Sequence, residues 1–70
     1  MDDSRMFPKI KELRLQNGYT QKYVASYLGI SINFYRKIEN IDSKVIKMQM
    51  LEDLAILYHT GIMDITGWDY

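Results

Sequence analysis

Two glycines, each followed two residues later by a hydroxyl side chain, divide the first half of the chain into short segments. Gly18 precedes Thr20, and Gly29 precedes Ser31. Glycine readily adopts the left-handed conformation that ends a helix, and threonine and serine are favoured N-caps of the helix that follows. The spacing therefore predicts short helices joined by turns too brief to contain a strand, the third helix over about residues 31–40.

Apolar residues recur at helical spacing on both sides of these turns. Pro8 suits the first turn of a helix, so we expect the first helix to begin at Phe7 or Pro8. Residues 49–58 show the i, i+3, i+4, i+7 pattern of a fourth amphipathic helix, and a short fifth turn is expected over residues 63–66. No segment shows the period-two alternation of a strand. We therefore expect an all-α bundle, whose core includes Ile10, Leu13, Leu15, Val24, Ala25, Leu28, Leu51, Leu54, Ala55 and Tyr58.

The chain has 70 residues, of which 47% are hydrophobic and none is cysteine. This length predicts one domain over residues 1–70 with a single small core. Without cysteine there is no thiolate zinc site, and the single histidine, His59, cannot hold a metal without converging carboxylates. The sequence around His59 shows no nucleophile that it could serve as a base. Glu52 and Asp64 lack the convergent partners that a hydrolytic site requires. We therefore expect no metal, no cofactor, no small-molecule ligand and no enzymatic activity.

The sequence shows no signal for export or membrane insertion. The N-terminal segment lacks the basic start and apolar run of a secretory signal, and no stretch reaches the ~20 apolar residues of a membrane span. Together with the absence of cysteine, these observations predict a cytoplasmic protein with no membrane partner.

The charges sum to zero but are distributed unevenly. Residues 5–38 contain seven lysines and arginines against one acid, Glu12, which gives +6 by simple count. Residues 48–70 contain four acids and no base. A zero net charge does not favour strong non-specific binding to a polyanion, but a basic first half can attract one locally. The sequence therefore predicts a molecule with a basic side and an acidic side.

Residues 30–41 have two different sides when they are placed on a helical wheel. The polar side carries Asn33, Arg36 and Asn40, flanked by Lys37 and Ile32. A surface helix needs a solvated face in any case, so this side alone does not establish a binding site. The apolar side is expected to pack in the core and consists of Ile30, Phe34, Tyr35, Ile38 and Ile41.

Two further features point to DNA. A short helix, a glycine-containing turn and a second short helix form the arrangement that holds one helix across DNA and places the other in the major groove. Asparagine can bond adenine bidentately, and arginine or lysine can bond guanine O6 and N7. Asn33, Arg36 and Lys37 are therefore residue types that can read base edges, and no acidic residue between positions 30 and 38 is present to repel phosphates.

Residues 10–40, IKELRLQNGYTQKYVASYLGISINFYRKIEN, resemble the phage-repressor and Cro-like helix-turn-helix family, also called the XRE family. The later LEDLAILY is similar to that family's fourth helix. The resemblance covers about residues 9–66 and rests on several separated elements: Gly18, Thr20-Gln21, Ala25, Leu28-Gly29-Ile30-Ser31, Ile38-Glu39-Asn40 and Leu54-Ala55. It implies a compact five-helix lambda-repressor-like bundle whose second and third helices bind DNA, with residues 67–70 as a tail.

The resemblance also implies roles for individual residues. Arg14 and Glu39 match an ion pair that ties the first helix to the third. The alternative is that they are two unrelated surface charges, whose pairing in solvent would stabilise the fold by only about 0–1 kcal/mol. Gln21 matches a glutamine that touches phosphate and supports the reading helix. Base contacts are expected from Ile32, Asn33, Arg36 and Lys37. Phosphate contacts are expected from Gln21, Lys22, Tyr23, Ser31 and Asn40.

We therefore expect a sequence-specific, double-stranded DNA-binding transcriptional regulator with the third helix in the major groove. One such domain buries little DNA, so a homodimer on a two-fold operator is expected. A second interpretation stays open, because Ile32 stands where a polar residue is usual, Phe34 replaces a small residue and Ile41 replaces a loop glycine. Apolar residues at Ile32, Phe34 and Tyr23 would also suit a protein-interaction module, either an adaptor or an antitoxin-like partner.

The remaining large side chains are assigned mainly to the core. Tyr19, Tyr23 and Tyr27 are spaced by four, and we expect Tyr19 and Tyr27 to pack inward and Tyr23 to face outward. Gap-filling core positions are expected for Met48, Met50 and Met63. Trp68 and Tyr70 either fold back on the bundle or form a contact between two subunits.

Overall fold

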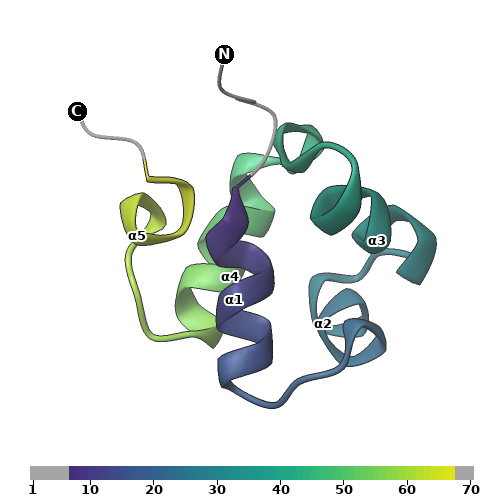
Figure 1. Ribbon diagram of the computed structural model, residues 1–70, viewed down its shortest axis with the longest axis horizontal. Coiled ribbons are helices and arrows are strands. Elements are labelled where there is room, and N and C mark those ends of the chain that lie inside the picture. The colour runs from purple at the N-terminus through teal and green to yellow at the C-terminus, as the bar shows by residue number, and fades with distance from the viewer. Residues whose placement is uncertain (1–6, 68–70) are drawn as a thin grey trace.

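The computed structural model describes residues 7–67, which form five α-helices and one short 3-10 helix (Figure 1). The elements are α1 (Pro8–Gln16), α2 (Gln21–Leu28), α3 (Ile32–Asn40), η1 (Ser43–Val45), α4 (Met48–Leu57) and α5 (Ile62–Thr66). No strand occurs within residues 7–67, so the predicted all-α class with five helices is confirmed. Trp68, Tyr70 and the tail expected beyond Gly67 lie outside the described residues.

Local capping sets the ends of α2 and α3. The Thr20 hydroxyl accepts from the Tyr23 amide at 3.0 Å, and the Ser31 hydroxyl accepts from the Phe34 amide at 3.1 Å. Gly29 ends α2 with a φ of 74°. A Cβ atom added there would meet no other atom within 4 Å, so glycine is needed for its backbone conformation and not for space. These caps fix the turn that carries α3 across α2.

One core joins all five helices. In Figure 1, α2 and α3 lie on one side of α1, and α5 lies on the other; α2 packs against α3, and α5 packs against α1 and α4. The buried apolar side chains are Phe7, Ile10, Val24, Ala25, Tyr35, Ile38, Ile46, Leu51, Leu54, Tyr58 and Ile65. Among residues 7–67, no helix has the length and apolar character needed to cross a bilayer.

Several side chains expected in the core are exposed instead. Ile41 is 62% exposed, because α3 ends at Asn40 and the helical wheel does not continue through the next residue. Helices of two or three turns present only a narrow stripe to the core, and the apolar residues that fall outside it remain exposed. The corrected residues besides Ile41 are Leu15, Tyr27, Met48 and Met63.

Other expectations about the core hold. Tyr19 is half-buried against the core, with its ring centroid 4.8 Å from that of Tyr23 and 6.1 Å from that of Tyr58. Tyr23 is exposed, as expected. Phe34, whose position was ambiguous, is half-buried and packs against the core. Ile30, Leu13, Leu28, Met50 and Ala55 are also partly buried against it.

Candidate nucleic-acid interface

One side of α3 presents a polar stripe to solvent. Asn33, Arg36, Lys37 and Asn40 are all exposed and lie at i, i+3, i+4 and i+7, so their side chains share one face of the helix. We call these four residues the α3 stripe. Ile32, the other residue expected to contact bases, is half-buried and packs against the core. The α3 stripe therefore offers amide and cationic donors on a single surface.

The exposed charges of α2 and α3 are all positive. Lys22, Arg36 and Lys37 are exposed, whereas Glu39, the one acid in these two helices, is buried. The surface formed by α2 and α3 thus carries three positive charges and no exposed acid. Such a surface attracts an anionic polymer even though the whole chain is neutral.

Arg14 of α1 and Glu39 of α3, for which the resemblance implies an ion pair, lie in direct contact. Arg14 Nε donates to Glu39 Oε2 at 2.7 Å, and Arg14 Nη2 donates to Oε1 at 3.2 Å. The two side chains are only 9% and 0% exposed. Arg14 Nη1 also donates to the carbonyl of Tyr19 at 3.0 Å. The pair therefore ties α1 and the turn after it to α3.

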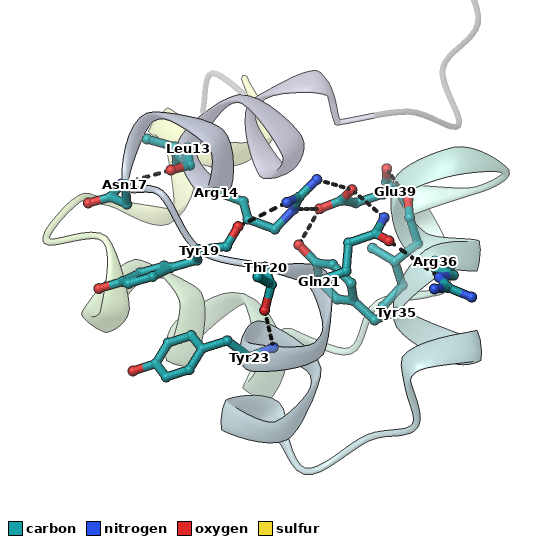
Figure 2. Close-up of polar contacts among 12 residues, drawn as sticks. Leu13, Arg14, Asn17, Tyr19, Thr20, Gln21, Tyr23, Tyr35, Arg36 and Glu39 are labelled. Atoms are coloured by element: carbon teal, nitrogen blue, oxygen red, sulfur yellow. Dashed lines mark hydrogen bonds and ion pairs between the residues drawn. The ribbon is translucent and has the colours of Figure 1, made fainter.

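Glu39 is the centre of a larger hydrogen-bond network (Figure 2). The Tyr35 hydroxyl donates to its Oε2, and Gln21 Nε2 donates to its Oε1 at 3.1 Å. Gln21 Oε1 in turn accepts from Arg36 Nε at 3.3 Å. The network runs from the buried ion pair to the α3 stripe. Sequence reasoning missed this link between Gln21 and Arg36, because the two residues are 15 positions apart.

Residues 10–64 match the family described as helix-turn-helix. The chain belongs to this helix-turn-helix family. The domain is of the XRE or Cro-like type, so the resemblance noted in the sequence is confirmed. The family consists of DNA-binding domains without enzymatic activity, so DNA is the partner that membership implies, and the expectation that the chain is not an enzyme is confirmed. No curated protein and no solved structure gives a significant match.

The residues of the helix-turn-helix domain that were predicted to contact phosphates lie on α2 and at the two ends of α3. Lys22 and Tyr23 are exposed on α2, and the Tyr23 ring lies beside Tyr19, not beside Arg36 (Figure 2). The Ser31 side chain caps α3, and Asn40 is the exposed last residue of that helix. Lys22, Tyr23 and Asn40 are therefore open to solvent.

The environment of Glu39 keeps its carboxylate charged. Burial opposes ionisation, but the hydrogen bonds from Arg14, Tyr35 and Gln21 outweigh it, so the pKa of Glu39 lies below its ordinary value. Burial and the bond to Glu39 raise the pKa of Tyr35, and the bond to Glu39 raises the pKa of Arg14. Each group therefore stays in the protonation state that the network of the helix-turn-helix domain requires.

Acid is expected to destabilise the domain through Glu39. The folded-state pKa is lowered, so as the pH falls below about 4.5 the unfolded chain takes up the proton first. The free energy of unfolding then decreases as the pH falls, until Glu39 in the folded protein is itself protonated. Above about pH 4.5 the stabilising contribution of ionised Glu39 is fully present. Urea unfolding at a series of pH values measures the effect. The variant Glu39→Gln should be less stable at pH 7 and should lose this part of the pH dependence; parallel curves for the two proteins would contradict the assignment.

Proposed function

We propose that this helix-turn-helix domain is a sequence-specific transcriptional regulator that binds double-stranded DNA with α3 in the major groove. The observation that carries the proposal is the α3 stripe, which combines exposed base-reading residue types with an absence of exposed acid on α2 and α3. Asn33, Arg36 and Lys37 face base edges in this proposal. Ile32 contributes through the exposed part of its side chain, which suits a thymine methyl group.

Phosphate contacts fix the register of the domain on the duplex without reading its sequence. We assign this role to Lys22 and Tyr23 on α2 and to Ser31 and Asn40 at the two ends of α3. For Gln21, whose amide already bonds Glu39 and Arg36, the contacts favour support of α3 over a phosphate contact.

The proposal includes a homodimer on a two-fold operator. The described residues measure 31 × 24 × 22 Å, so a single copy extends no further than about one turn of DNA, ~34 Å. Two copies on half-sites about one turn apart would supply the selectivity that one small domain lacks. A cytoplasmic location and a single domain over residues 1–70 belong to the same proposal.

Salt dependence tests the DNA-binding claim. The logarithm of the affinity for DNA duplexes of mixed sequence should fall linearly with the logarithm of the salt concentration. Lys22→Ala should weaken binding to all duplexes alike and reduce the slope by about 1. The matched control is Lys9→Ala. Lys9 on α1 pairs with Glu12, and its charge acts on Asp64 of α5, which lies on the other side of α1 from α2 and α3 (Figure 1). Equal effects of the two substitutions would contradict a contact at Lys22.

The alternative function, a protein-interaction module, depends on an exposed apolar patch at Ile32, Phe34 and Tyr23. Tyr23 is exposed, whereas Ile32 and Phe34 are half-buried and pack against the core. The DNA-binding function therefore has the stronger support. Retained binding to a protein partner in high salt, with no duplex bound in low salt, would reverse this preference.

A further inference from the structure

Three tyrosine rings form a stack that leads from the core to the surface where α2 begins. Tyr58, which follows α4, is 7% exposed, Tyr19 is half-buried and Tyr23 is 49% exposed. The ring centroid of Tyr19 lies 6.1 Å from that of Tyr58 and 4.8 Å from that of Tyr23. Both distances fall within the range of about 4.5–7 Å at which aromatic pairs attract each other. The buried ring of Tyr58 therefore supports Tyr19, and Tyr19 supports the exposed ring of Tyr23.

Backbone hydrogen bonds fix the segment that carries the two outer rings. The Tyr19 amide donates to the Arg14 carbonyl at 3.1 Å, and the Tyr19 carbonyl accepts from Arg14 Nη1 at 3.0 Å. The Tyr23 amide donates to the Thr20 hydroxyl at 3.0 Å. Stacking and these bonds together restrict both side chains, so a ligand that engages them removes less conformational freedom.

The hydroxyl groups of Tyr19 and Tyr23 are unpaired donors. Neither has a hydrogen-bond partner among residues 7–67, and both are open to solvent, whereas the Tyr58 hydroxyl is buried. The Tyr19 and Tyr23 hydroxyls point to the same side of the domain (Figure 2). We call these two groups the hydroxyl pair. Two donors on neighbouring rings are suited to a ligand with adjacent acceptor oxygens.

The hydroxyl pair is placed to meet the DNA backbone and not the bases. In a helix-turn-helix unit the first helix crosses the backbone while the second lies in the major groove. Tyr23 lies in the first turn of α2, and the hydroxyl pair points away from Arg36 of the α3 stripe (Figure 2). Lys22, between the two tyrosines in sequence, is exposed and positively charged. A backbone phosphate has two non-bridging oxygens that accept hydrogen bonds from tyrosine, so it is the ligand that fits.

We propose that the Tyr19 and Tyr23 hydroxyls together bind one backbone phosphate of the duplex, each donating to one of its non-bridging oxygens. The inference rests on the proposed function, because α2 lies across the backbone only if α3 enters the major groove. It makes Tyr19, whose ring packs against the core, a DNA contact as well. Because the hydroxyl pair is uncharged, it releases no counterion and adds affinity without adding to the salt dependence.

The test compares Tyr19→Phe, Tyr23→Phe and the double variant with the wild type on the preferred duplex and on duplexes of mixed sequence. Phenylalanine keeps each ring in the stack and removes only the hydroxyl. Each single variant should bind all duplexes about fivefold to tenfold more weakly, and the double variant more weakly than either. Base discrimination, the salt slope and the midpoint of urea unfolding should equal those of the wild type. Tyr27→Phe, which removes an exposed hydroxyl from the same helix, is the matched control and should change nothing.

A second measurement locates the phosphate. Single phosphates of the preferred duplex are replaced in turn by methylphosphonates, each of which lacks one of the non-bridging oxygens. At one position the replacement should weaken the wild type much more than the double variant. The absence of any such position would overturn the proposal.

The remaining outcomes separate this inference from the proposed function. Undiminished binding by both single variants, in a wild type that selects its sequence, overturns the hydroxyl pair alone. Loss of discrimination at one base pair in either variant would identify a base contact, and a lowered urea midpoint that accounts for the weaker binding would identify a structural role; both overturn the phosphate contact. A wild type that binds every duplex equally, and more tightly than the two variants, overturns sequence reading and leaves the hydroxyl pair standing.

Discussion

Replacing Arg14 by methionine is expected to lower the free energy of unfolding by about 3–5 kcal/mol. Methionine keeps the apolar stem of the side chain but removes the guanidinium, so the charge on Glu39 is left buried with only Tyr35 and Gln21 as donors. A domain of this size has a total stability of about 5 kcal/mol. The variant should therefore keep only about 0–2 kcal/mol of stability at 25 °C and unfold at a much lower urea concentration than the wild type, which urea titration followed by circular dichroism will measure.

The matched control is Arg36→Met, which removes the same group from an exposed site and should change the stability by less than about 0.5 kcal/mol. A double variant, Arg14→Met with Glu39→Leu, should recover part of the loss, because it removes the buried charge along with its partner. Equal losses in Arg14→Met and Arg36→Met would show that the buried pair does not stabilise the fold.

Asn33→Ala is expected to relax the preference for one base pair, reducing discrimination by about 1–3 kcal/mol. Asn33 is exposed on the α3 stripe, and the Ser31 cap and the buried face of α3 remain intact without it. The fold should therefore be unchanged. Competition binding with duplexes substituted at each position will locate the affected pair.

Asn17→Ala provides the control for this substitution. Asn17 follows α1, and its side-chain amide donates to the Leu13 carbonyl at 2.7 Å, so the change should affect helix stability slightly and base preference not at all. If Asn33→Ala weakened every duplex to the same extent, Asn33 would be a phosphate contact and not a reader of bases.

Local chemistry made much of the fold predictable. Both ends of α2 and the start of α3 follow from Thr20, Gly29 and Ser31, because caps depend only on residues within one helical turn. The division of α3 into a buried and an exposed face follows in the same way from helical periodicity. Such features need no knowledge of how the helices cross.

Features that depend on how the helices pack were not predictable. The wheel wrongly placed Ile41 in the core because it was drawn through residue 41, one position beyond the predicted and observed end of α3 at Asn40. The bond between Gln21 and Arg36 depends on where α2 crosses α3, and η1 is too short to leave a periodic pattern. Pairing of Arg14 with Glu39 came from family resemblance, and their burial required the packed structure.

Selection of bound fragments from a pool of random duplexes at low salt tests the central claim most directly. If α3 reads base edges as a member of a symmetric pair, the wild-type protein should enrich a two-fold motif whose half-sites are about one helical turn apart. The variant Asn33→Ala should enrich the motif with one position relaxed in each half-site. Recovery of unenriched, random sequences by folded wild-type protein would contradict sequence-specific DNA binding.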